Sequence, residues 1–229
     1  MKKYLAISIV SLLSAIAPSI SSAQLYVTAT IGGVPSVSGA TLENFDEPTL
    51  PSILTLSGAY VVSQTQNPLT FALPYFSGST AAFFGETPAT GPDGSQFIGI
   101  LGGSATATFS FPSPQHYFGI LWGSIDTANN LTFYDSANAV IGTMTGANIL
   151  SLTGGISGDQ GVNGTAYVNI TSTVAFSSVV ASCPNTGFEF DDVAYAQLVP
   201  EPTTSILFCG GFCLLGFAFR RTFTKSESA

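Results

Sequence analysis

Carboxylates are the side chains of this sequence whose type and spacing could do chemistry. Residues 24–199 hold eleven of the thirteen Asp and Glu residues and none of the five Lys and Arg. Neighbouring carboxylates in this segment therefore have no Lys or Arg to pair with, and they must repel each other, take up protons or bind a hard cation. Outside a cell that cation would be calcium, which binds about six to eight oxygen atoms from carboxylates, amides and backbone carbonyls.

Four carboxylates near the two ends of this segment are the candidate calcium ligands. Glu43 and Asp46 lie in the early motif Leu-Glu-Asn-Phe-Asp, and Asp191 and Asp192 lie in the late motif Phe-Glu-Phe-Asp-Asp-Val. The alternative is that all four simply face solvent. Calcium is the one cofactor for which the sequence offers a reason.

Several classes of enzyme and binding protein lack their required residues. Nucleic-acid binding and phosphate-binding loops need Lys or Arg, which the segment does not contain. A serine hydrolase would depend on His116, the one histidine, and no Gly-x-Ser-x-Gly motif is present. A glycosidase needs two carboxylates across a cleft, and Glu189 and Asp191 would share one strand face. We expect a non-catalytic protein with no catalytic residues, and a glycosidase-like enzyme is the least favoured alternative.

The elements that would position these carboxylates are short β-strands. Runs of β-branched and aromatic residues alternate with turn signals about every ten residues, which is typical of an all-β sandwich or barrel. We predict an antiparallel, jelly-roll-like β-sandwich over residues 24–198. The expected strands are Leu25–Ile31, Ala59–Val62, Ala81–Phe84, Ala105–Phe111, His116–Trp122, Asn130–Tyr134, Val140–Thr145, Thr165–Ile170, Val174–Val180 and Phe188–Ala194. Nine aromatic residues of these strands are expected to form the core: Phe109, Phe111, Tyr117, Phe118, Trp122, Phe133, Phe176, Phe188 and Phe190.

Residues 1–23 have the features of a secretory signal peptide. Lys2 and Lys3 precede an apolar stretch, and Ser21-Ser22-Ala23 supplies the small residues that a signal peptidase accepts. Cleavage is expected between Ala23 and Gln24. The alternative is an uncleaved N-terminal anchor.

Residues 199–229 form a second targeting segment. Val199-Pro200-Glu201-Pro202 precedes an apolar run at about 203–219 and then Arg220-Arg221. Seventeen residues are at the lower limit for a transmembrane helix, and the two arginines would stay on the cytoplasmic side. By these rules alone the segment is a membrane anchor with a short basic tail.

The order of these three parts resembles the PEP-CTERM sorting signal of bacterial proteins that an exosortase-type enzyme processes. The resemblance covers Val199 to Lys225, and it extends through three short motifs into the domain: the early and late acidic motifs and the central Tyr117–Asp126. It implies a bacterium with an outer membrane, transient insertion in the inner membrane, removal of the tail near Pro200–Pro202, and delivery to the cell surface or extracellular matrix. A permanent single-pass anchor is the alternative.

The sequence thus predicts a non-catalytic, exported surface or matrix protein. The first alternative is a carbohydrate-binding module that recognises surface or matrix polysaccharide. Expected partners are signal peptidase, the processing enzyme and extracellular polysaccharide, and no nucleic acid. Cys183 is the only cysteine between the two targeting segments, so an internal disulfide is not expected there.

Overall fold

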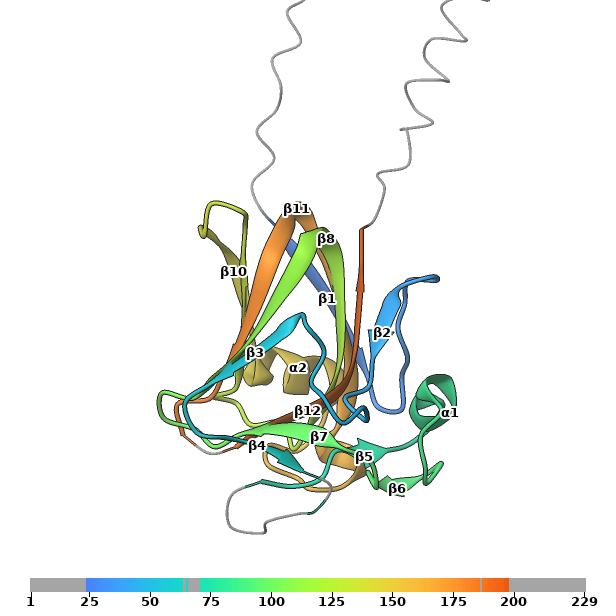
Figure 1. Cartoon of the computed structure of the whole chain (residues 1–229). Helices are drawn as coiled ribbons and strands as arrows, with labels where there is room; N and C mark the ends of the chain where they lie inside the picture. The colour runs from blue at the N-terminus through green and yellow to red at the C-terminus, as the bar shows by residue number, and fades with distance from the viewer. Residues whose placement is uncertain (1–23, 64, 66–70, 186, 198–229) are drawn as a thin grey trace, which may run out of the picture.

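A computed structural model of the chain describes residues 24–63, 65, 71–185 and 187–197 (Figure 1). The predicted signal peptide with its Ala23 cleavage site, and the predicted sorting segment from Val199 onward, lie outside the described residues. Within the described ranges, no helix has the length and apolar character needed to cross a membrane.

The domain is mostly antiparallel β-structure with few helices, as predicted (Figure 1). The helices are α1 (Thr80–Phe84), α2 (Gly146–Thr153) and a single 3-10 turn at Val162–Gly164. The strands are β1 (Leu25–Thr30), β2 (Thr41–Glu43), β3 (Leu54–Ser57), β4 (Tyr60–Ser63), β5 (Tyr75–Phe76), β6 (Gly91–Pro92), β7 (Phe97–Ile100), β8 (Thr106–Gly123), β9 (Asn130–Tyr134), β10 (Val140–Thr145), β11 (Ala166–Ser182) and β12 (Phe188–Ala196).

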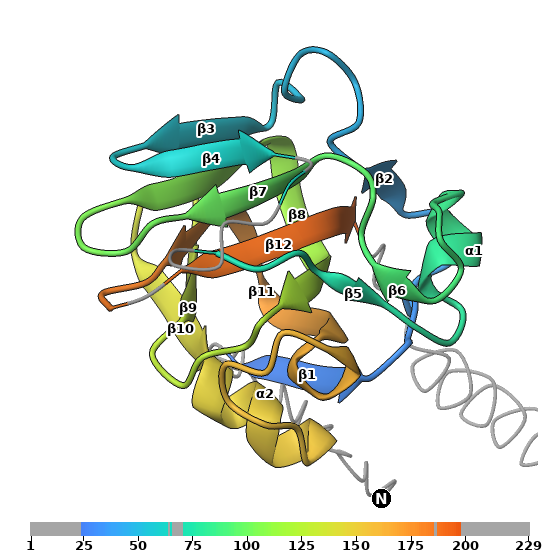
Figure 2. The ribbon, with the colours of Figure 1, turned by 90° about the horizontal axis from the view of Figure 1, so that it is seen from below.

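Two long strands, β8 and β11, run through both layers of the sandwich. The first half of β8 pairs with β3 on one side and with the second half of β11 on the other. That half of β11 pairs in turn with β9, and β9 pairs with β10. The second half of β8 pairs with the first half of β11 and with β12. The register of β11 against β8 shifts between Thr171 and Phe176, where the strands pass from one layer to the other. β1 then borders β11, and β7, β4 and β2 extend the β12 side (Figure 2).

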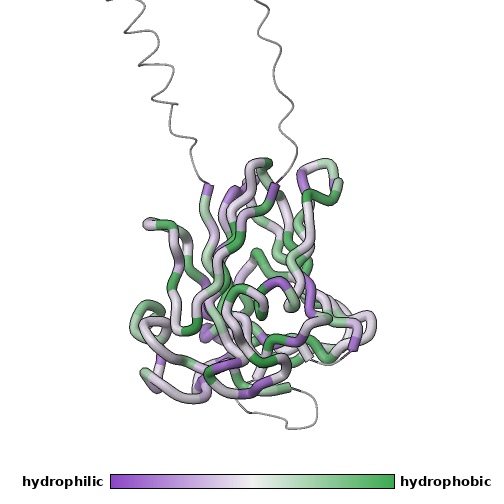
Figure 3. Tube along the Cα trace, turned by 180° about the vertical axis from the view of Figure 1, so that it is seen from behind, coloured by the Kyte–Doolittle hydropathy of each residue, from purple (hydrophilic) through white to green (hydrophobic). Residues whose placement is uncertain are grey.

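Aromatic side chains fill the space between the layers. Trp122 stacks on Phe188 with ring centroids 4.5 Å apart, and Phe190 contacts Phe109 at 5.5 Å. The predicted aromatic core is confirmed: its members are buried, except that Phe111 is half-buried. Along the tube of Figure 3 hydrophobic and hydrophilic residues interchange repeatedly, as expected for strands with one face toward the core.

The predicted strand at Ala81–Phe84 is wrong, because these residues form helix α1. Thr-Ala-Ala-Phe-Phe contains two alanines, and Gly85 ends the helix with a φ of 85° while its N–H donates to the Ala81 carbonyl. Alanine favours helix, and glycine adopts this left-handed conformation without steric cost. The predicted separate strands on either side of 112–115 and of 171–173 are continuous as β8 and β11.

Both ends of the described domain lie at the same end of the sandwich (Figure 1). The Gln24 N–H donates to Thr173 Oγ1, at the bend of β11. Gln197 Nε2 donates to the Pro114 carbonyl, at the bend of β8. The two predicted targeting segments therefore attach to neighbouring points.

Candidate functional site

Strand β12 changes its edge partner halfway along its length, and this change creates the candidate site. Phe190 pairs with Ile98 of β7, whereas Val193 pairs with Glu43 of β2. Asp191 and Asp192 lie between these two pairings. The segment that follows β2 and the segment that precedes β7 therefore meet beside the two aspartates. Figure 2 shows β2, α1 and β6 gathered next to β12.

A β-bulge at Asp192 places two consecutive carboxylates in the interior. Asp192 has a φ of 50°, and the register of β12 against β8 shifts between Asp191 and Ala194. The Tyr167 hydroxyl donates to the Asp192 carbonyl at 3.0 Å, and the Asp192 N–H donates to Asp191 Oδ1 at 2.7 Å. Both side chains are completely buried.

The segment after β2 supplies the outer carboxylates. Phe45 is buried against Phe190, with ring centroids 6.0 Å apart, and so fixes its two neighbours. Asn44 Nδ2 donates to Asp46 Oδ2 at 3.0 Å and to Glu86 Oε1 at 2.8 Å. Glu86 comes from the segment that follows α1. The amide of Asn44 thus holds two carboxylates from distant parts of the sequence.

The segment before β7 supplies the remaining carboxylate, Asp93, which is 1% exposed. The Ser95 hydroxyl donates to Asp93 Oδ1 and lies 3.5 Å from Asp191 Oδ2. The Ser95 N–H also donates to Asp93 Oδ1, at 2.7 Å, and the Gln96 N–H donates to Asp46 Oδ1 at 3.0 Å. We refer to Asp46, Glu86, Asp93, Asp191 and Asp192 together as the acid cluster.

Burial and mutual repulsion disfavour the charged forms of the acid cluster. Burial raises the pKa of Asp191 well above its usual range, and the charges of Asp192 and Asp93 raise it further. Burial likewise raises the pKa of Asp192, with added repulsion from Glu86, Asp93 and Asp46. Burial raises the pKa of Glu86 to about 7, against the lowering effect of the Asn44 hydrogen bond.

Three buried oxygen atoms of the cluster have no hydrogen-bond partner among the described residues. They are both carboxylate oxygens of Asp192 and Oδ2 of Asp93. A buried polar atom without a partner is costly, and the cost is greater when the group is charged. Such atoms call for a specific explanation, and a bound water molecule or ion is one.

The structure brings three of the four predicted calcium ligands together and separates the fourth. Asp46, Asp191 and Asp192 belong to the acid cluster. The charge of Glu43 instead helps to raise the pKa of Tyr195. Burial raises the pKa of the half-buried Glu43 carboxyl itself. Sequence reasoning did not select Glu86 and Asp93, because nothing in their local sequence shows that β12 changes partner beside them. The one available signal was the absence of Lys and Arg around all of them.

The carboxylates of the cluster do not converge closely as their side chains are oriented. No three of the described His, Cys, Asp and Glu residues form a group that could hold a metal ion in these orientations. A cation could be bound there only after side-chain rotations. The fold nevertheless brings the five residues to one region, because hydrogen bonds through Asn44, Ser95 and Gln96 connect the segments that carry them.

Glu189 is a further buried carboxylate on β12. It is 2% exposed, its Oε1 accepts a hydrogen bond from the Ala72 N–H at 3.3 Å, and its Oε2 has no partner among the described residues. Burial raises the pKa of Glu189 to about 8, and the charge of Asp126 adds to this. Glu189 and Asp191 are thus both buried, with different neighbours.

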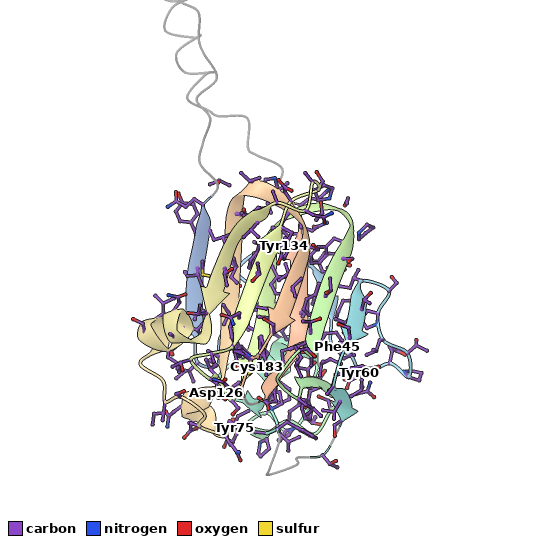
Figure 4. The ribbon with its side chains drawn as sticks, turned by 90° about the vertical axis from the view of Figure 1, so that its left-hand side faces the viewer. Phe45, Tyr60, Tyr75, Asp126, Tyr134 and Cys183 are labelled. Atoms are coloured by element: carbon purple, nitrogen blue, oxygen red, sulfur yellow. The ribbon has the colours of Figure 1, made fainter. Side chains whose placement is uncertain are left out.

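The exposed surface offers a few isolated aromatic side chains. Tyr26 is 54%, Phe83 45% and Tyr60 43% exposed. Tyr60 lies on the edge strand β4 at the outside of the domain (Figure 4), two residues from the exposed Val62. A groove of about 480 Å³ between β1, β10 and α2 is lined by Val27, Met144 and Leu152 among others, and no aromatic residue lines it.

Comparisons with known proteins identify one segment of the chain. The model of the PEP-CTERM protein-sorting motif matches residues 198–221. The match confirms the predicted resemblance of the C-terminal segment, and this motif implies exosortase processing and export with membrane-associated sorting in Gram-negative bacteria. The extension of the resemblance to the early, central and late motifs of the domain stays a prediction. No curated protein matches the chain.

The solved structures that the domain resembles are only distantly similar. The carbohydrate-binding module CsCBM6-3 from Clostridium stercorarium, solved with cellobiose, is 11% identical, with 61% of this chain and 94% of that chain covered. The module CBM6cm-2 from Cellvibrio mixtus lichenase 5A, solved with cellotriose, is 12% identical, with 61% and 97% covered. A family 43 arabinoxylan arabinofuranohydrolase from Bacillus subtilis is 13% identical, with 49% and 23% covered. The TM-score is 0.31 in each case, and these likenesses assign no activity to this chain.

Proposed function

We propose that this chain is a non-catalytic β-sandwich protein of jelly-roll type that is exported to the cell surface or extracellular matrix. The PEP-CTERM sorting motif at residues 198–221 would direct its sorting. The sorting motif is the observation that carries the proposal. The position of the last strand supports it, because β12 ends at Ala196 and the sandwich is therefore complete before residue 198, where the motif begins. The N-terminal signal peptide, with cleavage after Ala23, is part of the same proposal.

Replacement of Pro200, Glu201 and Pro202 by alanine in the full chain tests this proposal. We expect the unprocessed chain to accumulate in the inner-membrane fraction of the producing bacterium, whereas the unchanged chain reaches the surface or medium in a shortened form. Immunoblots of cell fractions with an antibody against the sandwich measure both. Ser205→Ala, within the apolar run, is the matched control and should be processed normally. Normal processing of the triple variant would contradict the proposal.

The burial of Glu189 and Asp191 supports the non-catalytic part of the proposal. A glycosidase needs both carboxylates of its pair at the scissile bond, in contact with the substrate. Here the two side chains are 2% and 0% exposed. Full-length protein should therefore release no reducing sugar from the polysaccharides of the producing cells. Release that is lost in Glu189→Gln would revive the enzyme alternative.

Carbohydrate binding is the second candidate function, and exposed Tyr60 is the observation that favours it. An aromatic ring beside Val62 on a strand edge offers an apolar platform of the kind on which sugar rings can pack. Sedimentation with extracellular polysaccharide isolated from the producing bacterium tests it. Binding that is reduced at least about tenfold in Tyr60→Ala, and unchanged in the control Tyr26→Ala, would support this function. Equal binding of both variants would contradict a Tyr60 platform.

A further inference from the structure

We propose that the acid cluster is a calcium site, in which Asp46, Glu86, Asp93, Asp191 and Asp192 enclose one Ca²⁺ between β12 and the segments that follow β2 and precede β7. The proposal concerns the folded domain itself and does not depend on how the chain is sorted. It rests on the juxtaposition of five carboxylates, on their buried oxygen atoms and on the lack of any basic partner.

No basic side chain of the domain can neutralise this cluster. Residues 24–199 contain neither Lys nor Arg. The histidine, His116, has its Nδ1 2.9 Å from the Ser172 carbonyl, at the bend where β11 passes between layers. The amino group that signal-peptide cleavage would create at Gln24 lies beside Thr173, at that same bend. When the carboxyl groups of the cluster are ionised, their counter-charge must therefore come from solution.

The buried oxygen atoms of Asp192 and Asp93 point to a ligand, independently of the clustering. Asp192 is completely buried with both of its carboxylate oxygens unpartnered among the described residues, and Asp93 is 1% exposed with Oδ2 unpartnered. Burial raises the pKa of Asp192, and the nearby charges of Glu86, Asp93 and Asp46 raise it further, so these carboxylates lie within electrostatic range of Asp192. A bound cation would satisfy all three oxygens at once.

The donor set identifies calcium among the common ions. The cluster offers carboxylate oxygens and the Ser95 hydroxyl, and it contains no Cys or His to favour zinc. Calcium accepts about six to eight oxygens in flexible geometry, whereas magnesium requires a near-ideal octahedron. That flexibility suits a site whose side chains must rotate to converge. Exposed Asp46 and half-buried Glu86 form its rim and give the ion a path from solvent.

Calcium binding would connect four separate segments of the sequence. Asp46 follows β2, Glu86 follows α1, Asp93 lies in the short β6–β7 link, and Asp191 and Asp192 belong to β12. Among the residues that the structure describes, β2 pairs only with Val193, Ala194 and Tyr195 of β12. The ion would hold β2 and the α1–β6 region onto the sheet.

Thermal unfolding and calorimetric titration of the full chain, solubilised in a non-ionic detergent, test the proposal. Calcium at about a hundred times its dissociation constant should raise the melting temperature by about 5–10 °C relative to excess chelator. Magnesium at matched ionic strength should give a much smaller rise. An identical melting temperature in calcium and in chelator, or an equal effect of magnesium, would overturn the assignment.

Two variants separate calcium binding from a purely structural role of the cluster. Asp192→Asn and Glu86→Gln should each weaken calcium binding at least about tenfold. In chelator, Glu86→Gln should melt no lower than the unchanged chain, because it removes repulsion and leaves an amide that Asn44 can still contact. Glu47→Gln, an exposed carboxylate next to Asp46, carries the same charge change and should keep the full calcium response. A calcium response retained in Glu86→Gln and Asp192→Asn would refute the site.

Terbium luminescence provides a readout that does not depend on stability. Tb³⁺ replaces Ca²⁺ at oxygen sites and emits when a nearby tyrosine is excited. Tyr167, whose hydroxyl donates a hydrogen bond to the Asp192 carbonyl, is the sensitiser that the structure supplies. Emission should rise on terbium addition, fall when calcium is added back, and be lost in Asp192→Asn but not in Glu47→Gln. Emission that calcium does not displace would place terbium elsewhere and count against the proposal.

Discussion

Two tyrosine hydroxyls anchor the segments around the acid cluster. Tyr117 donates to Asn169 Oδ1 at 2.5 Å, and the Ser36 N–H donates to the Tyr117 hydroxyl at 3.2 Å. The Tyr167 hydroxyl holds the Asp192 carbonyl. Both hydroxyls lie over Gly119, whose missing side chain leaves them room. The bulge that carries Asp192 therefore depends on neutral phenols packed against a glycine.

Ionisation of Tyr117 should destabilise the domain at high pH. Burial raises the pKa of Tyr117 to about 12, above its ordinary value of 10.0. The unfolded chain therefore releases this proton first, so the stabilisation is complete below pH 10 and is lost as the pH rises toward 12, by on the order of 2 kcal/mol. Urea midpoints between pH 8 and 11.5 measure the slope. Tyr117→Phe should flatten it, Tyr26→Phe should not, and equal slopes in all three proteins would contradict the prediction.

A methyl group at Gly119 should disrupt both tyrosine hydroxyls. An added Cβ would lie 2.6 Å from the Tyr117 hydroxyl and 2.7 Å from that of Tyr167. Both phenols would have to move and lose hydrogen bonds, so Gly119→Ala should cost about 2–4 kcal/mol in the free energy of unfolding. Gly142→Ala is the control, because its Cβ would meet only the flexible end of Leu25, and it should cost less than about 1 kcal/mol. Similar urea midpoints for the two variants would contradict the predicted difference in stability.

The residue types of the cluster could be predicted from the sequence, but its full membership could not. The absence of Lys and Arg indicated that Asp46, Asp191 and Asp192 needed another partner. Glu86 and Asp93 join them only because β12 exchanges β7 for β2 at Asp191–Asp192. Such a long-range exchange leaves no mark in the local sequence of either residue.

At the scale of elements, the sequence predicted some strands to the residue, misassigned one helix as a strand, and did not predict β3 or β7. The prediction for β9, Asn130–Tyr134, is confirmed to the residue. The predicted strand Ala81–Phe84 is helix α1, since alanines and the Gly85 cap outweigh two phenylalanines. The bends of β8 and β11 contain Pro112, Pro114 and Ser172, which resemble turn signals although the chain continues as a strand.

Helix α2 depends on its N-terminal cap. Thr145 Oγ1 accepts a hydrogen bond from the Asn148 N–H, and the Asn148 side chain accepts one from the Thr145 N–H. Thr145→Ala removes the first of these, and should lower the free energy of unfolding by about 1 kcal/mol. Ser151→Ala, which removes a hydroxyl at an exposed position inside the same helix, is the control and should be neutral or slightly stabilising. Chemical denaturation measures both, and a neutral Thr145→Ala would contradict the role of the cap.

For the whole molecule, the sequence was sufficient to predict an antiparallel sandwich and a sorting signal. Strand periodicity predicts layers, and the tripartite C-terminal motif is specific enough to be recognised without a structure. It could not reveal that β8 and β11 each serve both layers, because this depends on pairing between residues far apart in the chain, such as Thr106 with Ser182.

The uncompensated negative charge of the domain should make its stability depend on salt. Without divalent ions, raising NaCl from about 0.02 to about 0.5 M screens repulsion among the carboxylates and should raise the free energy of unfolding by about 1 kcal/mol. Urea denaturation in chelator measures this change. KCl should act equally, because screening does not distinguish the two monovalent cations. Stability that falls as NaCl rises would contradict the prediction.

The shared position of Gln24 and Gln197 also determines which way the domain can face. A chain held in a membrane by both predicted targeting segments could fold into this sandwich without threading either segment through the domain, because both segments attach at the same end of it. With both predicted targeting segments inserted in the membrane, the end that carries β4 and β7 would be the one farther from it (Figure 1).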